Sequence, residues 1–262
     1  MRRARTETFL TRRYHDHDVQ RGPDTLVVEE PLSIQLDGVL VATTMRTPGH
    51  DFELAAGFCH GDGLLGGAPV HHVKYCATSA AVDSEFNVVT VETDGAAPVP
   101  IPRLAPTSSS CGLCGSLTID ELRARLHPLN AAPFPLEVLA GAPERVRAEQ
   151  RLFDSTGAVH AAAAFDRLGT PRVVREDIGR HNAVDKVVGR LLLDGQLPAT
   201  DLGLFVSGRA SFEMVQKAWA AGFAAVVAVS APSALAVDTA RAAGITLAGF
   251  ARDGRMTIYS PA

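Results

Sequence analysis

The second half of the chain alternates apolar segments of two kinds, and this alternation limits the folds that are open to it. Apolar and β-branched runs predict strands at 159–165, 172–175, 202–206, 224–229, 245–250 and 256–259. Apolar residues at helical spacing predict helices at 179–193, 210–220 and 233–242. Strands and helices that alternate across short turns build a layered α/β domain, in which helices pack on a sheet.

The first half of the chain predicts a smaller α+β unit behind a charged tail. Strands are expected at 25–30, 39–44, 71–76 and 86–92, and a helix at 51–59. Residues 1–22 are expected to form a flexible tail, although His15-Asp16-His17-Asp18 would also suit a metal. The predicted organisation is a tail at 1–22, a small α+β domain at 23–106, a cysteine loop at 107–117 and an α/β domain at 118–262, which opens with a helix at 118–126.

Composition and charge exclude several classes of function. Of the 262 residues, 46% are hydrophobic and 21% charged, which is typical of a folded globular protein. The net charge of -4 leaves no basic excess to neutralise phosphates, which argues against general nucleic-acid binding. Residues 218–237 carry no charge, but Gly222 and Pro232 interrupt them, and 224–229 fits a buried strand better than a membrane span. With no apolar core of a secretory signal at the N-terminus, the protein is expected to be cytoplasmic, without membrane or nucleic-acid partners.

Two of the four cysteines form a close pair, Cys111-Gly112-Leu113-Cys114. In a reducing compartment such a pair is more often metal-binding or redox-active than a structural disulfide. Two thiols separated by two residues can meet in a turn, where one attacks a sulfur atom that the other carries. Cys111 and Cys114 are therefore the predicted catalytic residues.

Two alternatives for the pair stay open. Half of a four-cysteine zinc site is the stronger one, but Cys59 and Cys76 lie far apart in sequence and in predicted apolar elements, so no zinc is expected. A thioredoxin-like motif would follow a strand at the start of a helix. This pair instead follows the proline-rich segment 96–110.

Polar residues collect where predicted strands end. They occur in 175–186, which includes His181, in Ser207-Gly208-Arg209, at Ser230, and in Phe250-Ala251-Arg252-Asp253-Gly254-Arg255. Helix N-termini and arginines bind anions, and several such junctions at one sheet edge line a polar crevice. Each junction also has a structural explanation, namely helix capping, ion pairing, a solvated face or, for Asp253-Gly254, a hairpin turn.

Six segments in order give the chain a resemblance to a known family. They are Glu29-Glu30-Pro31-Leu32, Arg46-Thr47-Pro48-Gly49-His50-Asp51, residues 109–115, 175–186 and 207–217, and Val229-Ser230-Ala231-Pro232. With these segments the sequence, from about residue 25 to 259, closely resembles the FdhD/NarQ family of formate dehydrogenase accessory sulfurtransferases. The resemblance implies a sulfur carrier that takes persulfide sulfur from a cysteine desulfurase. The sulfur then passes to the bis-molybdopterin guanine dinucleotide cofactor, a molybdenum cofactor, before its insertion into formate dehydrogenase.

The resemblance also implies a fold and residue roles. Cys111 would carry the persulfide, with Cys114 as its neighbour, and the main domain would be cytidine-deaminase-like in a homodimer. The residues expected to bind the cofactor are His181, Ser207, Gly208, Arg209, Ser230, Phe250, Ala251, Arg252, Asp253, Gly254 and Arg255. The junctions 176–182 and 207–211 supply no cysteine, which argues against catalytic zinc and against deamination. The alternatives are a cofactor-binding chaperone that does not transfer sulfur and a zinc-stabilised structural protein.

Overall fold

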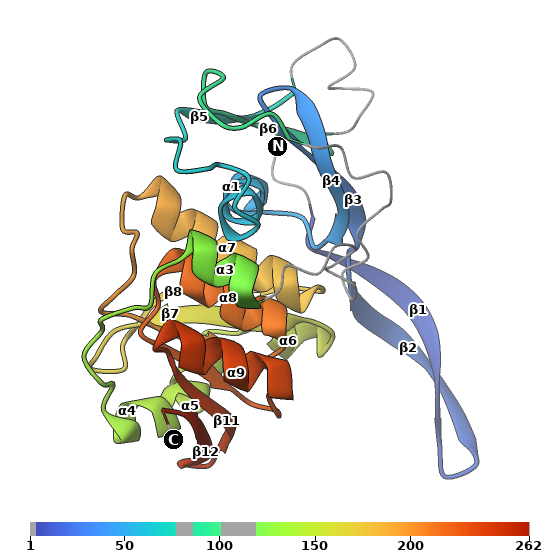
Figure 1. The fold of residues 1–262 in the computed structure, drawn as a ribbon. Coiled ribbons are helices and arrows are strands. Elements are labelled where there is room, and N and C mark those ends of the chain that lie inside the picture. Colours follow the sequence, from blue (N-terminus) through green and yellow to red (C-terminus); the bar gives the residue numbers. More distant parts are fainter. Residues whose placement is uncertain (1–3, 77–85, 101–118, 262) are drawn as a thin grey trace.

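The computed structural model describes residues 4–76, 86–100 and 119–261, and its architecture is mixed α/β, as predicted (Figure 1). Strands of the described residues form a two-stranded, a four-stranded and a six-stranded sheet. Cys111, Cys114 and the rest of the predicted cysteine loop lie outside the described residues. The fold described below is that of the remaining residues.

The six-stranded sheet has the order β12-β11-β10-β9-β7-β8. Its strands are β7 (His160–Phe165), β8 (Pro171–Asp177), β9 (Gly203–Val206), β10 (Ala225–Ala228), β11 (Thr246–Arg252) and β12 (Arg255–Ser260). Strands β9, β10 and β11 are parallel, whereas β7 and β12 run antiparallel to their neighbours. All six were predicted from the sequence, with ends that differ by one or two residues.

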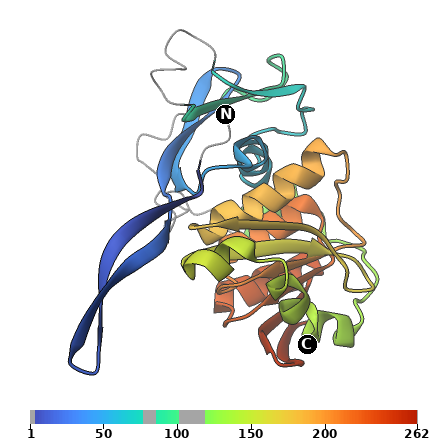
Figure 2. The ribbon, with the colours of Figure 1, turned by 180° about the vertical axis from the view of Figure 1, so that it is seen from behind.

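Helices cover both faces of this sheet because its strands are apolar on both sides (Figures 1 and 2). On one face lie α7 (Arg180–Leu193), α8 (Phe212–Ala221), α9 (Ala234–Ala243) and α3 (Ile119–Arg125). Leu204 and Val206 of β9 face this side, whereas Phe205 faces the other. On the other face lie α4 (Leu136–Ala140) and α5 (Ala142–Arg147). A third short helix, α6 (Arg151–Thr156), is bonded at its start to β8. The sequence predicted none of these three helices.

The four-stranded sheet belongs to the N-terminal half and packs against one helix. Its order is β4 (Val39–Arg46), β3 (Glu30–Leu36), β6 (Val88–Glu92) and β5 (His72–Tyr75). Leu32, Ile34, Val89 and Val91 of this sheet form a buried core with Leu54 of α1 (Asp51–Gly61). Helix α1 also packs along α7, and so joins the two sheets.

Two glycines allow α1 and α7 to cross with their backbones in contact. A Cβ atom on Gly57 of α1 would overlap the carbonyl oxygen of Asp185. A Cβ atom on Gly189 of α7 would overlap the carbonyl oxygen of Glu53. Neither carbonyl can move without disturbing its own helix, so the crossing requires glycine at both positions.

The N-terminal residues correct the expectation of a flexible tail at 1–22. Strands β1 (Thr6–His15) and β2 (Asp18–Val27) pair along their whole length and project away from the rest of the molecule (Figures 1 and 2). Asp16 and His17 form the turn with positive φ angles of 47° and 67°. The strand predicted at 25–30 is in fact the end of β2 and the start of β3.

No helix within residues 4–76, 86–100 and 119–261 is long and apolar enough to cross a membrane. The uncharged stretch at 218–237 is divided among the end of α8, strand β10 and the start of α9. It contains a buried strand, as the sequence predicted.

Candidate functional site

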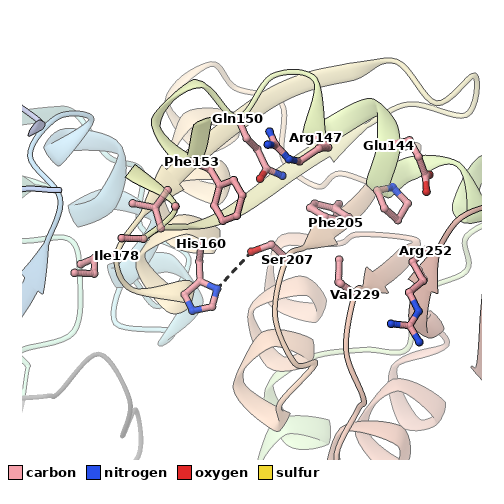
Figure 3. Close-up of a pocket in the computed structure, with 15 residues that line it drawn as sticks. Glu144, Arg147, Gln150, Phe153, His160, Ile178, Phe205, Ser207, Val229 and Arg252 are labelled. Atoms are coloured by element: carbon pink, nitrogen blue, oxygen red, sulfur yellow. Dashed lines mark hydrogen bonds between the residues drawn. The ribbon is translucent and has the colours of Figure 1, made fainter. Parts of the chain in front are cut away.

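A cavity of about 560 Å³ lies at the edge of the six-stranded sheet where β9, β10 and β11 end (Figure 3). Phe153 and His160 lie at one end of the cavity and Arg252 at the other, with Phe205 and Val229 between them. Carboxyl ends of parallel strands are where α/β sheets bind ligands. The cavity therefore has the position, the apolar floor and the charged rim of a ligand site.

Backbone hydrogen bonds beyond the strands hold the predicted polar junctions side by side. The amide of Ser230 donates to the carbonyl oxygen of Gly208 at 3.2 Å, and the amide of Phe250 donates to that of Ser230, also at 3.2 Å. The parallel pairing thus continues past the ends of β9 and β10. As the sequence suggested, these junctions meet at one sheet edge.

The predicted cofactor-binding residues divide into two groups. Ser207, Ala251 and Arg252 line the cavity. The others do not line it; they are His181, Gly208, Arg209, Ser230, Phe250, Asp253, Gly254 and Arg255. His181 is buried and forms an ion pair with Glu213 of α8.

The turn at 250–255 supports both of the explanations that the sequence left open. Asp253 and Gly254 have φ angles of 52° and 68° and connect β11 to β12, so this part is a hairpin turn. The amide of Asp253 donates to the carboxylate of Glu144 at 2.8 Å. Phe250 has a φ of 52° and lies where the pairing of β11 with β12 is irregular. This irregularity leaves Phe250 exposed while Ala251 and Arg252 face the cavity.

Sequence reasoning missed one whole wall of the cavity. Glu144 and Arg147 come from α5, Gln150 and Phe153 from the start of α6, and His160 from the first position of β7. The helices that carry four of them are short and have no clear apolar periodicity. The sequence showed Glu176 only as part of a polar junction, whereas in the structure its carboxylate accepts hydrogen bonds from the amides of Leu152 and Phe153 at 2.9 and 2.8 Å. Glu176 thus holds the start of α6 against β8.

The polar segment 175–186 mainly joins the two halves of the molecule. Asp177 is fully buried, and its Oδ2 accepts from Lys186 Nζ at 2.6 Å and from the amide of Thr47 at 3.1 Å. Asn182 donates to Asp177 at 3.0 Å and to the carbonyl oxygen of Met45 at 2.7 Å. Burial lowers the pKa of Lys186, against the opposite effect of Asp177. The structural explanation therefore accounts for these residues.

One further ion pair braces the N-terminal side of this junction, and another crosses it. Arg46 is fully buried and binds Asp51 through two hydrogen bonds of 3.1 and 2.9 Å. Arg175 of β8 binds Glu53 of α1 through two hydrogen bonds of 2.5 and 2.8 Å. Burial alone would raise the pKa of Glu53, but hydrogen bonds from Arg175 and His50 outweigh it and hold this pKa at about 2.

The side chains of the described residues form no metal site. Within that part of the chain, no group of three or more His, Cys, Asp or Glu side chains is placed to hold a metal ion. Cys59 is buried in the core that α1 shares with the four-stranded sheet, and burial raises the pKa of its thiol. Cys59 therefore behaves as an inert core residue.

Comparison with known proteins places the chain among relatives of similar length. The model of the FdhD/NarQ family matches residues 27–262. The sulfur carrier protein FdhD of Streptomyces avermitilis is 50% identical, over 97% of this chain and 94% of that protein. The protein of the same name from Streptomyces coelicolor is 48% identical, over 98% of this chain and 94% of its own.

One solved structure has the same fold over the whole chain. It is the crystal structure of a protein from Desulfotalea psychrophila that is assigned as a formate dehydrogenase accessory protein. The TM-score is 0.78 at 23% identity, and the match covers 98% of both chains. The family model and the close relatives agree with the motifs along the sequence. The chain therefore belongs to the FdhD/NarQ family.

Proposed function

We propose that this protein is a sulfurtransferase that carries sulfur from a cysteine desulfurase to the bis-molybdopterin guanine dinucleotide cofactor before the cofactor enters a formate dehydrogenase. Its relatives bear the name sulfur carrier protein, and the solved structure of the same fold is assigned as a formate dehydrogenase accessory protein. Cys111 and Cys114 supply the pair of thiols that such a carrier needs, although they lie outside the described residues.

The observation that carries the cofactor half of the proposal is the cavity at the sheet edge. The cofactor ends in guanine nucleotides, each with a flat base and phosphates. Phe153, Phe205 and Val229 offer apolar surface for a base, and Arg147 and Arg252 offer guanidinium groups for phosphate. The cavity thus combines the two kinds of surface that a nucleotide requires.

The proposed transfer balances in atoms and electrons with the two thiols. Cys111 carries a persulfide, whose outer sulfur is formally zero-valent. The thiolate of Cys114 attacks the inner sulfur, forms the Cys111–Cys114 disulfide and releases the outer sulfur as sulfide with the electron pair of the broken bond. The thiol proton of Cys114 passes to solvent. The sulfide is delivered to molybdenum, and a cellular thiol reductant restores the pair.

The experiment that tests the proposal is mass spectrometry after incubation with a cysteine desulfurase and cysteine. A gain of one sulfur atom is expected on Cys111 in Cys114→Ala, where no second thiol can release it, and none is expected in Cys111→Ala. Cys76→Ala is a matched control, because Cys76 is half-buried at the end of β5 and lies outside the pair. No gain in Cys114→Ala, together with tight binding of the cofactor, would instead establish a chaperone that transfers no sulfur.

Two further features remain part of the proposal. The family resemblance implies a cytidine-deaminase-like main domain and a cytoplasmic homodimer. Light scattering of the purified protein measures the oligomeric state, and a monomer at working concentration would contradict the dimer.

A further inference from the structure

His160 occupies a distinctive place in the cavity wall. It is the first residue of β7, half-buried, at the end of the cavity that Phe153 also lines (Figure 3). A Cβ atom on Gly208 would lie 3.6 Å from its ring and 3.7 Å from Cδ of Arg180, so both side chains pack close to the Gly208 backbone. The ring is thus held at the sheet edge beside the helix that begins at Arg180.

The hydroxyl group of Ser207 is the hydrogen-bond partner of the His160 ring. The hydroxyl oxygen of Ser207 accepts from the amide of Ala161 at 2.9 Å and lies 3.4 Å from Nδ1 of His160 (Figure 3). The single hydroxyl proton is then available for Nδ1. When that hydroxyl donates to Nδ1, the proton of the neutral ring is on Nε2.

Burial and charges from the neighbouring elements oppose protonation of the His160 ring. Burial lowers the pKa of His160, and Arg180 and His181 at the start of α7 lower it further, against a smaller opposite effect of Asp177 at the end of β8. The carboxylate of Asp177 is engaged by Lys186. His160 is therefore neutral at neutral pH when no ligand is bound.

Arginines and carboxylates both lie around the cavity. Arg252 lines it near Glu144, whose carboxylate is bonded to the amide of Asp253, and Arg147 lines it while paired with Asp154 of α6. Glu213 of α8 is paired with His181. Among the described residues at the end of the cavity that Phe153 lines, His160 is therefore the group whose protonation a bound anion would favour most.

We propose that His160 is a ligand-binding residue that takes up one proton when a phosphate diester enters the cavity. The choice of ligand class rests on the proposed function. The proton comes from solvent and binds Nδ1, which then donates to the Ser207 oxygen. That reversal releases the Ser207 hydroxyl proton, which becomes a donor for the ligand. One proton thus supplies both a positive charge and a second hydrogen-bond donor.

The test uses diguanosine pyrophosphate, because the charge of this diester does not change from about pH 5 to about pH 8, where histidine titrates. Calorimetry in two buffers of different ionisation enthalpy measures the protons taken up on binding. The wild type should take up close to one proton at mildly acidic pH. Its affinity should rise as pH falls, by up to about tenfold per pH unit in the window between the pKa of the free and the bound His160.

Variants separate this role from a structural one. His160→Gln should bind the probe with no proton uptake and with an affinity that is independent of pH. His72→Gln is the matched control, because His72 is exposed on β5, away from the cavity, and it should behave as the wild type. Binding by the wild type without proton uptake would overturn the role of His160 and leave the proposed cofactor site intact.

If the probe does not bind, the proposed cofactor site is contradicted. A direct titration then still tests the role of His160. The His160 imidazole is then titrated by NMR in the wild type with and without sulfate, whose charge is also constant over this range. A rise in its pKa with sulfate supports the anion-linked proton, and an unchanged pKa overturns it. This measurement needs no variant and is therefore independent of misfolding.

Discussion

Arg252 and Arg255 are neighbours across the last hairpin, yet only one of them lines the cavity. The sequence could not distinguish them, because both flank the same Asp253-Gly254 turn. The distinction arises from the irregular pairing between Gly249 and Arg252, which turns Ala251 and Arg252 toward the cavity. A local backbone feature thus decides which arginine is able to meet a ligand.

Replacement of Arg252 by alanine should weaken the binding of guanosine diphosphate by about tenfold or more, since a charge-assisted hydrogen bond contributes ~1.5–3 kcal/mol and ~1.4 kcal/mol is tenfold. Arg255→Ala is the matched control and should change the affinity by less than about twofold. Isothermal calorimetry measures both. Equal losses in the two variants would mean that the turn acts only through its net charge.

His160 marks the limit of sequence reasoning at this scale. The residue begins a run of alanines, and nothing in that run indicates a ligand site. Its role becomes visible only when β7 pairs with β9 and brings Ser207 to its ring. The two residues are 47 positions apart, and their contact depends on the register of the sheet. That register could not be read from the sequence pattern.

At the scale of elements, the crossing of α1 and α7 reverses the usual effect of replacing a helical glycine. Alanine normally stabilises a helix relative to glycine by roughly 0.5–1 kcal/mol. Gly189→Ala should instead destabilise the protein by about 1–3 kcal/mol or more, because its methyl group meets the backbone of Glu53. Urea unfolding measures the change.

Gly22→Ala provides the comparison for this prediction, since a Cβ atom there meets nothing within 4 Å. It should leave the free energy of unfolding almost unchanged. If Gly189→Ala is as stable as Gly22→Ala, the two helices do not cross with their backbones in contact.

The elements that the sequence predicted are those whose burial follows a simple period. Helix α7 buries Val184, Val187, Val188 and Leu191 at helical spacing, and β10 is apolar throughout. The hairpin β1–β2 was missed because it buries neither face, so charged residues such as Arg12 and Arg13 occur within its strands. Helices α4 to α6 were missed because each spans five or six residues, too few to show a period.

At the scale of the whole molecule, the ion pair between Glu53 and Arg175 connects the N-terminal half to β8. The folded pKa of Glu53, about 2, lies below its ordinary value of 4.5. The pair therefore contributes stability above about pH 4.5, and that contribution is lost as pH falls through this range toward about 2. Acid should loosen the contact between the two halves.

Glu53→Gln should lower the stability at neutral pH and flatten its dependence on pH between about 4.5 and about 2. Urea midpoints measured across that range test this. The control is Asp154→Asn, which removes the carboxylate that pairs with Arg147 at the surface and should leave the slope as it is. A slope that is unchanged in Glu53→Gln would show that other carboxylates control unfolding by acid.

The contact of α1 with α7, which joins the two halves, determines how this protein can be shortened. A fragment that starts after residue 118 would keep α7 and the buried Asp177–Lys186 pair. Asp177 would no longer accept from the amide of Thr47, and Arg175 would lose the carboxylate of Glu53. Removing α1 would also uncover the face of α7 that packs against it, including Leu192, and exposed apolar surface would favour aggregation of the isolated fragment over a soluble half. The two halves should therefore be expressed, and exchanged between relatives, only as one unit.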